Sequence, residues 1–237
     1  MLVNGAGKSK HSRRKLMKNQ IWGKNYRNQD GEIPITDIEK AFSSKGPILV
    51  ERAEPGFIES SDNRIYFYSE IERDKVLQLV RTLKIKSDEM IVQQKTWTLD
   101  TPPPLYLHIQ SYGGTSHAGL AALDHILEIR KKVPVYTVID GVAASAATFV
   151  SLAGSKRFIH KHAFTLIHQL STMFWGTYEE LKDEKYNCDK LMELVKSLYS
   201  EYTKVPNKIL EETLKRDVYF TAEESLKYGI VDQIIGK

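Results

Sequence analysis

Ser145 is the side chain of this sequence whose surroundings most favour covalent chemistry. The segment "GVAASAATFVSLAG" places it among small and apolar residues, where an apolar strand is expected to give way to a helix. A hydroxyl at the first turn of a helix has backbone N–H donors and the positive end of the helix dipole beside it. If Ser145 attacks a carbonyl, the N–H of Ala146 can stabilise the oxyanion. Serine also packs well between a helix and a strand, so Ser145 alone does not define a site.

A glycine turn supplies a possible second donor. "SYGGT" follows an apolar segment and contains Gly113 and Gly114. Glycine suits a turn whose backbone must approach a substrate closely. Two amides directed at one oxygen form an oxyanion hole, and losing one such donor costs about 3–4 kcal/mol in the barrier.

A nucleophilic serine needs a base, and His168 and Asp217 are the candidates. His168 in "FTLIHQL" ends an apolar strand and is followed by polar residues, so its imidazole could face a cleft. Asp217 precedes a short strand at 218–220, and the capping box "TAEE" then opens a helix that Gly229 closes. Each residue also has an ordinary interpretation, as a structural histidine and as a turn residue.

Strands, turns and helices alternate from Leu105 onward, which predicts an α/β fold with parallel strands and both sheet faces covered. The expected order is strand 105–110, glycine turn, helix 118–131, strand 133–140, a turn at Gly141 and helix 144–153. Ligands of such folds bind beyond the carboxyl ends of the strands, where the glycine turn and Ser145 lie.

The segment before Leu105 is predicted to begin with a strand at 64–71 and a helix over 76–83. The polar stretch 86–104, "KSDEMIVQQKTWTLDTPPP", ends in three prolines and is interpreted as a surface loop or hairpin.

Four segments together resemble the ClpP family, the proteolytic subunits of Clp protease. "IQSYGGTSHAGLAALDHI", "GVAASAA", "LIHQL" and "KRDVYFTAEESLKYGIVD" match the family's oxyanion, nucleophile, histidine and aspartate segments in the same order, over about residues 64–235. The resemblance implies a ClpP/crotonase-like fold, with parallel βαβ units and a protruding handle helix.

The resemblance also implies roles for individual residues. Ser145 would be the nucleophile, His168 the general base and then acid, and Asp217 the group that orients the imidazole. The amides of Gly114 and Ala146 would form the oxyanion hole. Such a triad is defined by its geometry and not by its order along the chain.

An extended peptide substrate is expected to pair as an added strand near Thr115 and Leu170. Because such pairing contacts main chain, selectivity for sequence should be weak. No cofactor or metal is expected, since ATP is used by the partner unfoldase and not by this chain.

The family resemblance predicts a homo-oligomer, a ring of seven that stacks into a fourteen-subunit chamber and receives unfolded protein from an AAA+ unfoldase of the ClpX, ClpA or ClpC type. A helix over 177–204, within a handle at about 171–205, would pack against another subunit. Lys215 departs from the family, which commonly carries an acid there that pairs across rings. Stacking is therefore less secure than the triad.

The basic charge of the chain is concentrated at its start. Residues 1–29 contain eight Lys and Arg and no acid, whereas the remainder contains 26 basic and 30 acidic residues. The partition is predicted as a flexible basic extension, 1–60, and a peptidase domain, 61–237. We expect neither a nucleic-acid partner nor membrane insertion. "GAGKS" lacks the spacing of a phosphate-binding loop.

A single cysteine suits a reducing compartment, so the expected location is the cytoplasm, with an organelle stroma or matrix or a phage-infected cytosol as alternatives.

Three other functions remain open at this point. The chain could be a catalytically silent structural or regulatory subunit of a Clp ring. It could catalyse acyl-CoA chemistry on the related crotonase fold, which uses two amides and would not need Ser145. It could also be a Ser/Lys peptidase, which would not need His168.

Overall fold

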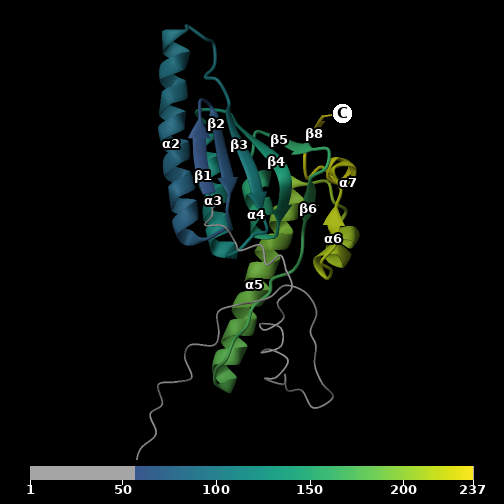
Figure 1. The fold of residues 1–237 in the computed structure, drawn as a ribbon. Coiled ribbons are helices and arrows are strands. Elements are labelled where there is room, and N and C mark those ends of the chain that lie inside the picture. Colours follow the sequence, from purple (N-terminus) through teal and green to yellow (C-terminus); the bar gives the residue numbers. More distant parts are fainter. Residues whose placement is uncertain (1–56, 237) are drawn as a thin grey trace, which may run out of the picture. The chain divides into compact units, whose positions relative to one another are not determined.

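A mostly parallel β-sheet forms the centre of the computed structural model, which describes residues 57–236 (Figure 1). The strand order is β1-β2-β3-β4-β5-β8, with β6 paired to β4 and β7 paired to β6. The strands are β1 (Phe57–Ser61), β2 (Arg64–Tyr68), β3 (Leu105–Ser111), β4 (Val135–Ala144), β5 (Lys156–His160), β6 (Phe164–Leu166), β7 (Tyr219–Phe220) and β8 (Gln233–Ile235). The helices are α2 (Arg73–Thr96), α3 (Ser116–Ile129), α4 (Ala146–Leu152), α5 (Tyr178–Tyr202), α6 (Asn207–Leu214) and α7 (Ala222–Lys227).

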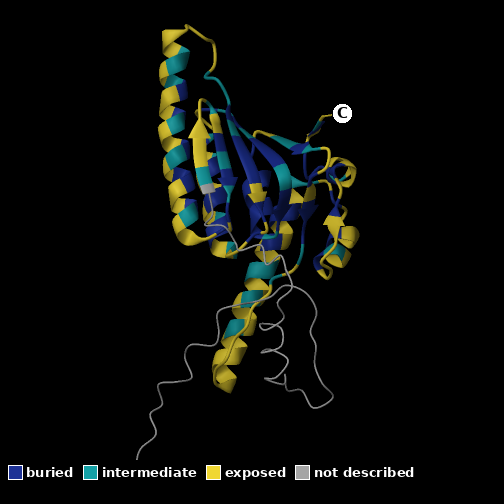
Figure 2. Cartoon of the chain, viewed as in Figure 1, coloured by how far each residue is buried: buried dark blue, intermediate teal, exposed yellow. Residues whose placement is uncertain are grey.

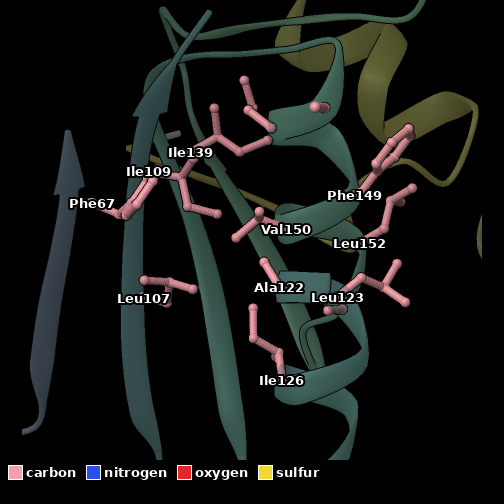
Figure 3. Close-up of a cluster of buried hydrophobic side chains, with 14 of the residues drawn as sticks. Phe67, Leu107, Ile109, Ala122, Leu123, Ile126, Ile139, Phe149, Val150 and Leu152 are labelled. Atoms are coloured by element: carbon pink, nitrogen blue, oxygen red, sulfur yellow. The ribbon is translucent and has the colours of Figure 1, made fainter. Parts of the chain in front are cut away.

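The predicted α/β class with parallel βαβ units is confirmed. Strands β2, β3, β4, β5 and β8 pair in parallel, whereas β1 pairs antiparallel with β2 and β7 with β6. Side chains alternate across the sheet, so one face is apolar and meets the helices. Ile109 and Ile139 on the strands pack with Ala122 and Ile126 of α3 and Val150 of α4 (Figure 3). Burying one such large side chain contributes about 1.5–3 kcal/mol.

The expectation that helices cover both faces is wrong for the described part of the chain. From β2 to β5 the strand order never reverses. Successive right-handed crossovers that step in one direction leave their helices on the same face. The other face carries partly exposed aromatic side chains, namely Tyr66, Tyr106, Tyr136 and Phe158.

Helix α2 is longer than predicted, because it continues from Arg73 to Thr96 through most of the stretch interpreted as a loop. Val80, Leu83, Ser87 and Met90 are all buried, and their spacing keeps them on one face of the helix. The polar composition of the exposed face concealed this periodicity. The connection to β3 therefore begins only at Trp97.

Strand β4 does not turn at Gly141 but runs on to Ala144. The pairing with β3 shifts between Ile109 and Ser111, where β4 carries two additional residues. Such a bulge bends the strand and changes the direction of its end. Gly141 faces the side chain of Gln110, whose Oε1 would lie 3.1 Å from a Cβ at this position. The turn into the helix is consequently at Ser145.

Helix α5 confirms the predicted long helix. A capping box of Thr177 and Glu180 begins it, as the predicted box of Thr221 and Glu224 begins α7. On α5 only Val195, Leu198 and Tyr199 are buried, so most of the helix extends away from the sheet (Figure 2). None of the helices in residues 57–236 is long and apolar enough to span a bilayer.

The predicted basic extension lies almost wholly outside the described residues. The boundary at residue 60 stays a prediction, and the described residues all belong to one compact unit.

Candidate active site

Ser145 joins β4 to α4 in an unusual backbone conformation. Its φ is 55° and its ψ is −129°, and it is the N-cap residue of α4. A non-glycine residue at positive φ stores about 1–3 kcal/mol of strain, which the surrounding structure must hold. The N–H of Ser145 donates to the carbonyl of Leu166 at 2.9 Å. The Ser145 side chain makes no capping hydrogen bond to α4, so capping does not occupy the hydroxyl.

The glycine turn lies directly against the elbow, the sharp turn at Ser145 between the end of β4 at Ala144 and the start of α4 at Ala146. Gly113 and Gly114 have φ values of 102° and 144°. A Cβ added to Gly113 would lie 2.7 Å from the Cβ of Ser145 and 3.2 Å from the amide nitrogen of Ala146. Only a residue without a side chain permits this approach to Ser145, which adds to the predicted reason for glycine, the approach of a substrate.

The hydrogen bonds around Gly114 orient its amide. The carbonyl of Gly113 accepts from the N–H of Ile71 at 2.7 Å, and the N–H of Thr115 donates to the carbonyl of Ile71 at 2.8 Å. In a parallel bridge of this kind, the central residue directs its own N–H away from the partner. The Gly114 amide therefore faces away from Ile71, on the side where Ser145 and Ala146 lie.

His168 and Asp217 meet although 49 positions separate them in the sequence. The Nδ1 of His168 lies 3.2 Å from Oδ1 of Asp217. Strands β6 and β7 pair Thr165 with Phe220 and Leu166 with Tyr219, and continuing this register by two residues puts His168 opposite Asp217. The N–H of Gln169 donates to the carbonyl of Leu214 at 2.7 Å and holds the two segments together.

The pairing of β4 with β6 brings Ser145 to the same place. Ala144 pairs with Leu166, so Ser145 and the His168 segment leave the sheet side by side. The His168 side chain is only 9% exposed and its Nε2 is buried, whereas the Asp217 side chain is 66% exposed. A carboxylate at Nδ1 leaves Nε2 as the basic atom of the imidazole, which a general base for a nucleophilic serine requires.

The two predicted substrate-contact residues already use their amides. The N–H of Thr115 bonds Ile71, as described above. The N–H of Leu170 donates to Sδ of Met192 on α5 at 3.2 Å. A thioether is a weak acceptor, so a peptide carbonyl could replace it at Leu170.

A second polar cluster lies on the exposed face of the sheet and was not predicted. The carboxylate of Asp140 accepts from Tyr68 and contacts Nδ1 of His108 at 3.0 Å and Nε2 of His160 at 3.3 Å. These residues come from β2, β3, β4 and β5, and no local motif marks them. Their proximity depends on strand register, which the sequence pattern does not specify.

The contacts of this cluster define the tautomer of His108 and shift the pKa values of Asp140 and Tyr68. Arg64 approaches Nε2 of His108 at 3.3 Å. A guanidinium can only donate, so Nε2 of His108 accepts and the proton lies on Nδ1, facing Asp140. Burial alone would raise the pKa of Asp140, but hydrogen bonds from His108 and Tyr68 and the nearby imidazoles hold it below its usual value. Burial and the bond to Asp140 raise the pKa of Tyr68.

The cluster lines a cavity of about 580 Å³ that also includes Lys161 and His162. Within residues 57–236 no group of three or more ligating side chains is arranged to hold a metal ion. The polar contacts of Asp140 connect four strands of the sheet.

The fold and site together define a class. A parallel α/β sheet presents a serine at a strained strand-to-helix turn, beside a glycine loop and a histidine held by an aspartate, and serine hydrolases share this layout.

Comparison with known proteins identifies the family. The family model described as Clp protease matches residues 59–237. An ATP-dependent Clp protease proteolytic subunit of Deinococcus radiodurans is 31% identical over 173 residues, which cover 71% of this chain and 83% of the relative. An ATP-dependent Clp protease proteolytic subunit 2 of Treponema denticola is 34% identical over 139 residues, which cover 58% of this chain and 68% of the relative. The chain belongs to the Clp protease family, which confirms the family predicted from the sequence.

Proposed function

We propose that this chain is a serine endopeptidase, the proteolytic subunit of an ATP-dependent Clp protease. Membership in the family and the names of the two relatives support this activity. The observation that carries the site assignment is the strand pairing around His168. The contact of this imidazole with Asp217 and the pairing of Ala144 with Leu166, which precede Ser145 and His168 in their strands, support the assignment.

In the proposed reaction, Oγ of Ser145 attacks the carbonyl carbon of the scissile peptide bond while Nε2 of His168 takes its proton. The resulting oxyanion receives hydrogen bonds from the amides of Gly114 and Ala146. His168 then returns the proton to the leaving amine as the C–N bond breaks, which leaves an acyl-enzyme. A water molecule, deprotonated by His168, hydrolyses the ester and restores the serine.

Asp217 orients the imidazole and stabilises its positive charge during both steps. Because the Asp217 side chain is largely exposed, its electrostatic contribution is screened by water. We therefore assign its main effect to fixing the tautomer and direction of His168, so that Nε2 is the basic atom.

Substrate binding is proposed to occur by strand addition along the backbone near Thr115 and Leu170. At Leu170 the substrate carbonyl would displace Met192 from the amide. Contacts to main chain suit unfolded polypeptides of varied sequence.

We further propose that the chain works as a homo-oligomeric ring of seven in the cytoplasm, fed by an AAA+ unfoldase of the ClpX, ClpA or ClpC type that hydrolyses ATP. The chain itself needs no cofactor in this scheme. Stacking of two rings is less favoured, because Lys215 bonds Glu212 of its own helix at 3.0 Å where an acid would pair across rings.

The triad is tested with Ser145→Ala, His168→Ala and Asp217→Asn in the full-length assembled protein. Cleavage of a short fluorogenic peptide should fall by at least about 10³-fold in the first two variants and by less in the third. A fluorophosphonate probe should label Ser145 in the parent, more slowly in Asp217→Asn, and not in Ser145→Ala.

The same variants separate the alternatives. A silent ring subunit would resist the probe and cleave nothing. Crotonase-type chemistry would bind CoA and survive Ser145→Ala, and a Ser/Lys peptidase would survive His168→Ala. Any of these results would overturn the proposal.

A further inference from the structure

A chain of buried hydroxyl groups connects the long helix α5 to the carbonyl of Ser145. The Oγ1 of Thr148 donates to the carbonyl oxygen of Ser145 at 2.6 Å, and the hydroxyl of Tyr199 lies 2.6 Å from the same Oγ1. Thr148 is on α4 and Tyr199 is near the buried end of α5. Both are buried, with Tyr199 only 1% exposed.

The chemistry of the three groups determines the direction of these hydrogen bonds. The carbonyl of Ser145 can only accept, so the single hydroxyl proton of Thr148 points toward it. Tyr199 must then donate to Thr148. Burial raises the pKa of Tyr199 despite its hydrogen bond to Thr148, which keeps the phenol protonated as this donor role requires.

The carbonyl of Ser145 shares a peptide plane with the N–H of Ala146. In a trans peptide the two groups point in opposite directions, so fixing one fixes the other. The carbonyl accepts two hydrogen bonds from Thr148, one from Oγ1 and one from the backbone N–H at 2.9 Å. Bonds that polarise a carbonyl also strengthen its amide as a donor, by about 10–30% per bond.

We infer that Tyr199 and Thr148 are positioning residues that aim the Ala146 amide into the oxyanion hole. This inference rests on the proposed function, in which Ala146 supplies one of the two oxyanion donors. The strained Ser145 conformation makes such support necessary, because rotation of the 145–146 peptide would relieve the strain and turn the amide away. Thr148 holds this peptide from the α4 side, and Tyr199 holds Thr148 from α5.

The placement of Tyr199 also couples α5 to the elbow. Tyr199 packs its ring against Phe149 with centroids 5.9 Å apart, and it is one of three buried residues on this helix. A shift of the buried end of α5 would move the phenol relative to Thr148. We therefore expect peptidase activity to depend on the position of the buried end of α5 relative to α4.

Tyr199→Phe and Thr148→Val test the inference, because each removes a hydroxyl and keeps the shape of the side chain. In the full-length protein, we expect kcat for a short peptide to fall on the order of 10-fold for Tyr199→Phe and about 30-fold for Thr148→Val, with KM nearly unchanged. Thr148→Ser retains the hydroxyl and should recover most of the activity. Ser151→Ala is the matched control, because it removes a buried hydroxyl of α4 that bonds the carbonyl of Thr148 and not Ser145.

Two further measurements distinguish positioning from a structural role. A peptide aldehyde forms an oxyanion when it adds to the serine, so its inhibition constant should rise in parallel with the loss of kcat/KM. Because the two hydroxyls act in series, the double variant should be no worse than Thr148→Val alone.

The outcomes separate this inference from the proposed function. Parent-like kcat and aldehyde inhibition in Tyr199→Phe and Thr148→Val, with an inactive Ser145→Ala, would overturn the inference alone. Multiplicative losses in the double variant would also overturn it. Full activity of Ser145→Ala would instead refute the proposed function on which it rests.

Discussion

The geometry of the proposed site depends on the backbone conformation of a few residues as well as on their side chains. Ser145 holds a positive φ because β4, β6 and Thr148 bind its backbone on three sides. Gly113 can lie against it only because Gly113 has no Cβ. The reactivity proposed for Ser145 is thus a property of the packed turn as much as of the hydroxyl.

Gly113→Ala should inactivate the enzyme and destabilise it. The added Cβ would lie 2.7 Å from both the Ser145 Cβ and the Ala144 carbonyl, at a φ of 102° that side chains rarely adopt. We expect a loss of about 1–3 kcal/mol in unfolding free energy and of at least about 100-fold in peptidase kcat/KM. Chemical denaturation and peptide cleavage measure the two effects.

Gly236→Ala is the control for this prediction. It also has a positive φ, of 86°, but no atom lies within 4 Å of its added Cβ. It should lose some stability and keep its activity. Equal activity loss in both variants would contradict a specific clash at the elbow.

Sequence patterns predict features that depend on adjacent residues. They do not reveal contacts that depend on how distant strands pair. The glycine turn and the capping box of α7 follow from adjacent residues, whereas the turn predicted at Gly141 lies at Ser145 because β4 continues to Ala144. The contact between His168 and Asp217 needs the β6–β7 register, and a slip of one residue would turn the side chains to opposite faces. The cluster around Asp140 requires three correct registers at once, so no motif could reveal it.

At the scale of elements, the polar contacts of Asp140 connect β4 to β2, β3 and β5. Its partners Tyr68, His108 and His160 each come from a different strand. Helix α2 illustrates a related point. Its buried positions follow helical spacing to Met90, yet the polar residues between them resembled a loop. The polar composition of 86–104 led to the prediction of a loop, whereas the helical spacing of its buried residues would have predicted the helix.

The Asp140 cluster predicts a pH-dependent contribution to stability. Its pKa is lowered in the folded state, so its stabilisation is complete above the unfolded value of about 3.9 and is lost as the pH falls through the folded value. Asp140→Asn should therefore cost about 2 kcal/mol of unfolding free energy near neutral pH. The difference from the parent should shrink below about pH 4.

Denaturant unfolding of both proteins across the pH range measures this difference. Asp183→Asn, at an exposed position on α5, serves as the control and should differ little from the parent at any pH. A deficit in Asp140→Asn that stays constant into strong acid would show that the carboxylate charge is not what stabilises the sheet.

At the scale of the whole molecule, the exposed apolar side chains of α5 and of the loop before it indicate an interface. Trp175 is 98% exposed, and Met173, Tyr178, Leu181 and Leu194 are also exposed. This many large apolar side chains exposed on one loop and the helix after it favour an association site. Together with the family, this supports packing of α5 against another copy of the chain.

Trp175→Asp should weaken assembly, because a carboxylate placed in an apolar interface loses its hydration without gaining a partner. Native mass spectrometry of the parent should give a whole-number multiple of the 27.1 kDa chain, with a shift toward smaller species in the variant. Trp97→Asp is the matched control, since Trp97 is also exposed, at 61%, but follows α2 at the other end of the sheet (Figure 1).

If Tyr199 links α5 to the oxyanion hole, the disassembled variant should also lose peptidase activity while Trp97→Asp keeps both mass and activity. A parent that is monomeric and fully active would contradict the ring, and with it the need for α5 to be seated by a neighbouring subunit.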